Sequence, residues 1–165
     1  MIEIKTLPIK YKSIDSLGIA EHYILKTVNA SGKEMLLSHP NLFLYHETND
    51  SLNTSKRYAA IISKFYSYLS TQDKFLKIDI SKYHVIADNR DIRRWQIDRQ
   101  TKRVEKQSVK PTSETIFEEA RVLLNFFRWL LGVGYTTNVS IQHKDWIANF
   151  KSKRMLNYIQ KRAKT

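Results

Sequence analysis

The sequence predicts a mainly α-helical fold, a bundle of four to five helices with a small N-terminal β-hairpin or three-stranded β element. Three observations support this fold class. Two long stretches, beginning near Asn53 and after Pro111, place apolar residues at helical spacing. A shorter and highly charged stretch after Asp88 adds a further helix. The first 40 residues are instead rich in Ile, Tyr, Val and Thr, which favour strands.

The N-terminal region contains two predicted strands, residues 2–11 and 22–28. The turn signal Asn-Ala-Ser-Gly at 29–32 precedes a short apolar run, which predicts a hairpin with the first strand as a possible third member. Pro8 has no amide proton, so it would place its strand at a sheet edge or interrupt it. Pro40 breaks the pattern, so the β-rich region is expected to cover residues 1–40.

The first predicted helix begins near Asn53 and has one apolar face, formed by Tyr58, Ile61, Ile62, Phe65 and Leu69. Either Asn53 or Thr54 can supply the N-cap oxygen. Residues 71–87 have no strong period and are expected to form a loop. Asp88 is then expected to cap the short charged helix, which carries Ile92, Trp95 and Arg99.

A basic, polar linker ends at Pro111 and precedes the strongest helix signal in the chain. The apolar face of this helix contains Ile116, Ala120, Leu123, Phe127 and Leu130. Gly132 is expected to stop it, and Gly134 to extend the turn. The opposite face carries Glu114, Glu118, Arg121, Asn125 and Arg128. A last helix is expected over about 143–162.

The net charge of +12 is unevenly distributed along the chain. Residues 1–50 hold five basic and six acidic side chains, whereas residues 51–165 hold 23 and 10. A polyanion is the natural partner of such a surface, because each neutralised phosphate releases counterions. A membrane surface would require an amphipathic helix with an exposed apolar face, so no membrane partner is expected. There is no cysteine, secretion signal or membrane-length apolar run, and we expect a soluble, cytoplasmic protein.

Complete catalytic and cofactor motifs are missing from the sequence. The five histidines are scattered, and His46-Glu47 has no partner histidine four residues on. Four glycines form no phosphate-binding loop, and no serine lies in a nucleophile elbow. We therefore expect no metal, no cofactor and no self-contained active site.

The starts of the two long helices combine hydroxyl and basic side chains. Helix N-termini present amides and a positive dipole end, so phosphates bind there, while Lys and Arg contact the DNA backbone and a few groups reach bases. The alternative is that Thr54 and Thr112 are ordinary caps beside solvated lysines. The expected DNA-binding residues are Thr54, Ser55, Lys56, Arg57, Lys64, Lys110, Thr112, Ser113, Arg121 and Arg128.

The order and residues of these helices resemble the core-binding (SAM-like) domain of tyrosine recombinases, the phage-integrase family. The first helix contributes Asn53-Thr54, Tyr58, Ile62, Phe65 and Tyr68-Leu69 to this resemblance, and the later one Thr115-Ile116, Ala120, Leu123-Leu124, Phe126 to Leu130 and Gly134-Tyr135. The charged helix between them contributes Asp91-Ile92-Arg93-Arg94-Trp95. The similar region is residues 41–138.

The resemblance implies sequence-specific binding of double-stranded DNA at a recombination half-site of a mobile element. In that family a separate domain catalyses DNA integration with a tyrosine nucleophile, arginines, a lysine and a histidine-type residue. No histidine of this sequence is followed three residues later by arginine, and Tyr158 is better explained by a place on the last helix. Residues 139–165 are thus expected to form a C-terminal helix and basic linker toward a missing catalytic domain.

Other roles for the chain remain open at the level of sequence. Residues 1–40 are nearly neutral, so packing on the bundle or contact with another protomer of the recombinase is preferred over DNA binding. An RNA- or single-strand-binding module would use the tryptophans and tyrosines for stacking. A protein-interaction domain with an incidental basic surface is the other alternative.

Overall fold

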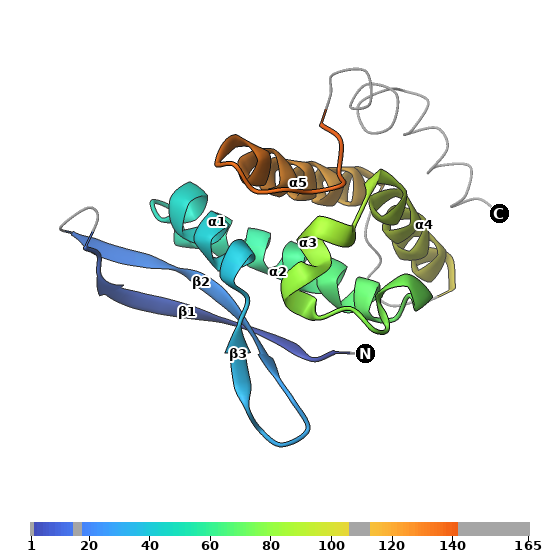
Figure 1. Cartoon of the computed structure of the whole chain (residues 1–165). Helices are drawn as coiled ribbons and strands as arrows, with labels where there is room; N and C mark the ends of the chain where they lie inside the picture. Colours follow the sequence, from blue (N-terminus) through green and yellow to red (C-terminus); the bar gives the residue numbers. More distant parts are fainter. Residues whose placement is uncertain (1, 15–17, 106–112, 142–165) are drawn as a thin grey trace. The chain divides into compact units, whose positions relative to one another are not determined.

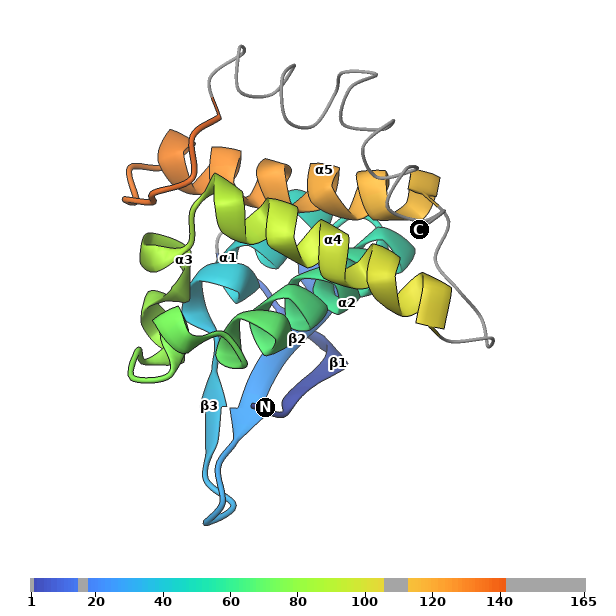
Figure 2. The ribbon, with the colours of Figure 1, turned by 90° about the vertical axis from the view of Figure 1, so that its right-hand side faces the viewer.

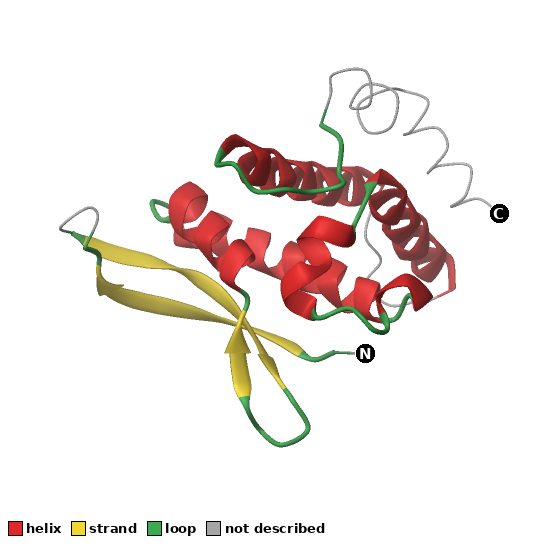
Figure 3. Cartoon of the chain, viewed as in Figure 1, coloured by secondary structure: helices red, strands yellow, loops and turns green. Residues whose placement is uncertain are grey.

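The computed structural model describes residues 2–14, 18–105 and 113–141. The chain divides into two compact units, residues 1–84 and 85–165, which are treated separately below. Among the described residues there are five α-helices and one small three-stranded antiparallel sheet (Figures 1 and 3). A helical chain with a small β element is therefore confirmed, while the core-binding bundle remains an expectation from the resemblance.

The sheet of the first unit consists of β1 (Ile4–Lys12), β2 (Ile19–Val28) and β3 (Glu34–Leu36), in the order β1-β2-β3. The predicted hairpin and its third strand are thus confirmed. At the tip of the β2–β3 hairpin, Asn29 Oδ1 accepts hydrogen bonds from the amides of Ser31 and Lys33 at 3.0 and 2.8 Å. This hairpin extends away from the helices of its unit (Figure 2).

Pro8 lies in the middle of β1 without interrupting it, opposite Tyr23 of β2. The amide of Tyr23 donates to the side chain of Ser55, so it points away from β1. In an antiparallel pair, if the N–H of one residue points away from the partner strand, the N–H of the residue opposite it also points away. The nitrogen of Pro8 therefore points away from β2, toward the outer edge of the sheet. The edge position expected from Pro8 is confirmed, and its missing N–H also interrupts the row of donors that another strand would use.

The sheet of the first unit packs against two helices: α1 (Ser38–Thr48) and α2 (Leu52–Ser70) both contact β2, and α2 also contacts β1. The sequence prediction missed α1, because Pro40 was interpreted as a break. Pro40 instead lies in the first turn of the helix, where its missing N–H has no intrahelical partner to lose. The strands, which lie before residue 40, contact α1 and α2, which extend beyond it, so these contacts span the expected domain limit.

The edge of β2 that β3 leaves unpaired is covered by helix side chains. β3 pairs only with residues 26–28, so alternate amides nearer the start of β2 have no strand partner there. Their acceptors are Asn49 Oδ1 for Glu21, Ser55 Oγ for Tyr23 and Asn41 Oδ1 for Leu25, at 2.9, 2.8 and 2.7 Å. The helices thereby satisfy backbone groups that burial would otherwise leave unpaired.

The segment expected to be a loop at 71–87 contains three short helical pieces. These are η1 (Asp73–Phe75), η2 (Ile80–Lys82) and α3 (Tyr83–Ile86). The loop prediction is therefore wrong. Each piece buries only one or two side chains, namely Phe75, Ile80 and the pair Tyr83 and His84, and such short anchors leave no repeating apolar period in the sequence.

The second unit contains α4 (Asn89–Glu105) and α5 (Ser113–Gly132), which contact each other. Asp88 caps α4 as predicted, since its Oδ1 accepts from the amides of Arg90 and Asp91 at 2.9 and 3.1 Å. The predicted apolar face of α5 is buried throughout: Ile116, Ala120, Leu123, Phe127 and Leu130 are all 0% exposed.

The end of α5 also follows the prediction. The helix stops at Gly132, and Gly134 has a φ of 96° in the turn that follows. The chain then returns to the start of α4, where Asn89 exchanges two hydrogen bonds with the backbone of Ser140 at 2.7 and 3.0 Å. The last helix expected over 143–162 lies outside the described residues.

Candidate nucleic-acid interface

The start of α2 is capped differently from the prediction. Ser51 is the N-cap residue, and its Oγ accepts from the amide of Thr54 at 3.4 Å and donates to Thr54 Oγ1 at 2.9 Å. The cap therefore lies two to three residues before the expected Asn53 or Thr54. Thr54 is half-buried and its hydroxyl is engaged by Ser51, whereas Asn53 is exposed.

Ser55 is not available to a partner, contrary to the sequence prediction. Its side chain is 0% exposed, and its Oγ accepts the amide proton of Tyr23 on β2. A buried hydroxyl of this kind cannot contact a phosphate without opening the unit. Ser55 is therefore a structural residue, which local sequence could not reveal because its partner lies 32 positions away.

The basic residues of α2 are exposed, as a DNA-contacting role requires. Lys56, Arg57 and Lys64 all reach solvent, and the guanidinium of Arg57 lies 5.4 Å from the ring centroid of Tyr58. Arg57 and Lys64 are seven residues apart, so they share one face at about 10 Å along the axis. Residues 52–70 contain no Asp or Glu; Asp50, before the cap, is the nearest carboxylate in sequence. We call Lys56, Arg57 and Lys64 the α2 cationic face.

Three arginines of α4 differ in their surroundings. Arg90 and Arg94 are exposed and lie one turn apart. Arg99 instead forms a bidentate ion pair with Glu119 of α5, at distances of 2.9 to 3.1 Å, and its guanidinium also lies 5.8 Å from the ring of Trp95. Of the three arginines Arg90, Arg94 and Arg99, the first two can contact an external polyanion without losing a buried partner.

The predicted contacts on α5 are less favourable for DNA. Arg121 is exposed, but its Nη1 donates to Glu118 at 2.8 Å, and the same outer face also carries Glu114. Arg128 is exposed on this face as well. The two arginines and two glutamates leave the face close to neutral. Of the remaining predicted residues, Lys110 and Thr112 lie outside the described residues, and so does the side chain of Ser113.

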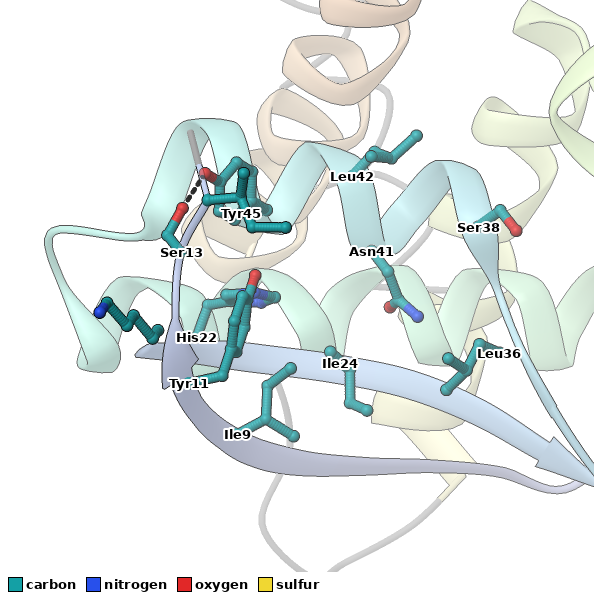
Figure 4. A pocket seen from close by; sticks show the side chains of 12 residues that line it. Ile9, Tyr11, Ser13, His22, Ile24, Leu36, Ser38, Asn41, Leu42 and Tyr45 are labelled. Atoms are coloured by element: carbon teal, nitrogen blue, oxygen red, sulfur yellow. Dashed lines mark hydrogen bonds between the residues drawn. The ribbon is translucent and has the colours of Figure 1, made fainter. Parts of the chain in front are cut away.

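An apolar cavity of about 690 Å³ opens between the sheet and α1. The sequence prediction missed it. Its lining includes Ile9, Ile24 and Leu36 of the strands and Leu42 of α1, and Figure 4 shows Asn41 pointing from α1 toward β2. A polar cluster lies at one end, with Ser13 and Tyr45 hydrogen-bonded at 2.7 Å. The strand prediction could not indicate this cavity, because one of its walls is α1, which the sequence prediction missed.

The hydrogen bonds of His22 in this cluster fix its tautomer. Its Nδ1 lies 2.9 Å from the carbonyl oxygen of Tyr23, which can only accept, so Nδ1 carries the proton. Its Nε2 is then an acceptor, and the hydroxyl of Tyr11 donates to it at 3.0 Å. The polar groups at this end of the cavity thus satisfy one another.

A second feature missed by sequence is a stacked histidine pair in the first unit. The rings of His39 on α1 and His84 on α3 have centroids 3.8 Å apart, with 30° between their planes. Burial, together with the nearby charge of protonated His39, lowers the pKa of His84 to about 4. Burial also lowers the pKa of His39. The two histidines lie 45 positions apart in sequence, so their contact could not be recognised from the sequence.

Because the pKa of His84 is lower in the folded state than in the unfolded chain, the pair is expected to make the protein acid-sensitive. The stability contribution is fully present above pH 6.5 and is lost as the pH falls toward 4. We expect a loss of about 1–2 kcal/mol in unfolding free energy by pH 5, measured by urea unfolding across pH. His84→Phe should remove most of this dependence, and His46→Gln, at an exposed histidine, should not. A pH profile that His84→Phe leaves unchanged would contradict this assignment.

Among the described residues, no group of three or more His, Asp or Glu side chains is arranged to hold a metal ion. Over the same residues, no helix is both long and apolar enough to cross a membrane. Comparison with known proteins gives no match, either to a family model, to a curated protein or to a solved structure. The functional assignment therefore depends on the surfaces described above.

Proposed function

We propose that this chain binds double-stranded DNA, with the α2 cationic face as the main contact of the first unit. The single observation that carries this proposal is that α2 exposes three basic side chains on a helix without any carboxylate. Such a surface attracts phosphates without an internal anion to neutralise it. The arginine pair Arg90 and Arg94 supplies a second exposed cationic surface on α4.

The chemistry of the α2 start suits backbone contacts with limited base readout. Lys56 and Arg57 lie in the second turn, close to the helix start, whose free amides and positive dipole end also favour anions. The exposed Asn53 carries an amide that can both donate to and accept from a base edge. A recombination half-site is the target that the resemblance to tyrosine recombinases implies, with this chain as the DNA-holding part of an integrase.

The test is fluorescence-anisotropy binding of a duplex over a range of salt concentrations. The variant Lys56→Gln/Arg57→Gln is expected to weaken duplex binding about tenfold and to reduce the salt slope by about one per lost phosphate contact. Lys5→Gln/Lys33→Gln removes the same charge from exposed positions of the sheet and its hairpin, and it should leave the salt slope unchanged.

Several outcomes would redirect the proposal. An equal loss in both double variants would mean that only net charge matters and would remove α2 from the interface. Preference for a single strand would favour the RNA- or single-strand-binding alternative, against which the burial of Trp95, Tyr66 and Tyr83 already argues. Absent or salt-insensitive duplex binding would favour the protein-interaction alternative.

A further inference from the structure

The apolar cavity between the sheet and α1 is large enough to hold a small molecule. Its volume of about 690 Å³ lies within the usual range of ligand sites, about 300–1,000 Å³. The aliphatic side chains of its lining are Ile9, Ile14, Ile24, Leu36 and Leu42. Leu36 and Leu42 are 59% and 40% exposed, so part of this apolar surface is open to solvent. A ligand with an apolar segment would remove that surface from water.

The hydrogen-bonding groups of the cavity gather mainly at one end. The bonded pair Ser13 and Tyr45 lies at this end, and Leu36 lies at the opposite one (Figure 4). The rings of Tyr11 and Tyr45 both contact His22, each with a centroid distance of 5.7 Å. These contacts hold the polar end in one arrangement. The cavity is therefore amphiphilic, apolar along most of its length and polar at one end.

The polar end also carries the charge of the cavity. Among the described residues of the lining, Lys12 is the one lysine or arginine, and none is Asp or Glu. Lys12 precedes Ser13 in the sequence, so it belongs to the polar end, and it is exposed. The long stem of a lysine can cover apolar surface while its ammonium group stays in water. A lone cation at the rim of an apolar cavity attracts an anionic group and repels a cationic one.

We propose that this cavity binds one medium-chain fatty acid as a free, monomeric carboxylate. The alkyl chain lies along Ile9 and Ile24 toward Leu36, and the carboxylate lies at the end of Ser13, beside Lys12. Burial of the chain supplies most of the affinity, and the lysine sets the direction in which the ligand lies. The lining shares no residue with the α2 cationic face, so this proposal goes beyond DNA binding and does not depend on it.

The test is an NMR titration of the methyl-labelled full chain with octanoate, at constant ionic strength. Saturable shifts are expected for the methyl groups of Ile9, Ile24, Leu36 and Leu42, which line the cavity. Decanoate should bind about fivefold more tightly than octanoate, because it buries two further methylene groups. Octanol has the same chain as octanoate but no charge, and it serves as the uncharged comparison for the variants below.

Two pairs of variants separate the charged end from the apolar end. Lys12→Gln should weaken octanoate binding about threefold and leave octanol binding unchanged, whereas Lys10→Gln, exposed on the same strand but outside the lining, should change neither. Leu42→Ala should weaken the binding of both ligands about fivefold. Leu52→Ala removes a similarly exposed leucine at the start of α2, outside the lining, and should weaken neither.

Four outcomes would overturn the proposal. The first is shifts that do not saturate, and the second is an equal response to octanoate in Lys12→Gln and Lys10→Gln, or in Leu42→Ala and Leu52→Ala. The third is a change of the same methyl signals with protein concentration alone, accompanied by a doubled mass in sedimentation, because a second copy would then fill the cavity. The fourth is a response to anionic vesicles but not to free octanoate, which would indicate a membrane surface. Duplex binding is measured separately, so failure of either proposal is distinguishable.

Discussion

Replacing Glu119 by alanine is expected to lower the free energy of unfolding by about 3–5 kcal/mol. The carboxylate is 4% exposed and accepts three hydrogen bonds from Arg99 across the α4–α5 contact. Its removal would leave the guanidinium of Arg99 against Trp95 without a counter-charge, and an uncompensated charge in a partly buried position is costly. Urea unfolding followed by far-UV circular dichroism measures the effect.

The neighbouring residue provides a matched control for Glu119. Glu118 also forms an ion pair, with Arg121, but the two side chains are 45% and 49% exposed. Exposed pairs contribute little, so Glu118→Ala should change the unfolding free energy by less than about 1 kcal/mol. Replacing both buried partners, as Arg99→Met/Glu119→Leu, should recover most of the loss, since no charge is then left unpaired. Equal effects of the two alanine variants would show that burial does not control these pairs.

Asn41→Ala is expected to cost about 2–3 kcal/mol, the second largest effect. The side chain of Asn41 accepts from the amide of Leu25 at 2.7 Å and donates to its carbonyl oxygen at 3.1 Å. Leu25 is 0% exposed, so the amide would be left buried without a partner, while its carbonyl oxygen would still accept from Leu37 at 3.2 Å. The free energy is measured by urea unfolding, and hydrogen exchange reports on the Leu25 amide directly.

The control for Asn41 is an asparagine without such a partner. Asn53 is exposed in the first turn of α2, and Asn53→Ala should change the unfolding free energy by less than about 0.5 kcal/mol. In Asn41→Ala the amide of Leu25 should exchange much faster, whereas the Lys26 to Leu36 strand pairing should keep its protection. If Leu25 keeps its protection in the variant, the proposed edge capping by α1 is wrong.

The helices with a strong apolar period could be predicted from sequence, and those held by single contacts could not. The inward face of α5 was predicted residue by residue, because a 3.6-residue repeat can be recognised directly in the sequence. For α2 the predicted Ile61, Ile62, Phe65 and Leu69 are buried, whereas Tyr58 is half-buried. The first helix, α1, was missed since Pro40 looks like a break unless the helix start is known. The three short pieces between residues 73 and 86 each bury only one or two side chains, which is too few to produce an apolar period.

The candidate site likewise has features that the sequence predicted and features that it did not. Basic side chains were correctly expected on the outside of α2, where Lys56, Arg57 and Lys64 are exposed. Whether an arginine of the second unit is available depends on its partner: Arg94 is exposed, but Arg99 is bound to Glu119, 20 positions away. Duplex binding itself remains a prediction that the salt titration will decide.

The sequence by itself determined the helical periods, the edge position of Pro8, the caps and stops at Asp88 and Gly132, and the excess of positive charge. These are local properties, set by backbone sterics and by the spacing of apolar residues along one element. Only the tertiary structure decided that Ser55 is buried on the edge of β2 and that the rings of His39 and His84 stack on each other. Each of these depends on residues far apart in sequence, and burial, which fixes the strength of their hydrogen bonds and charges, exists only after the elements pack.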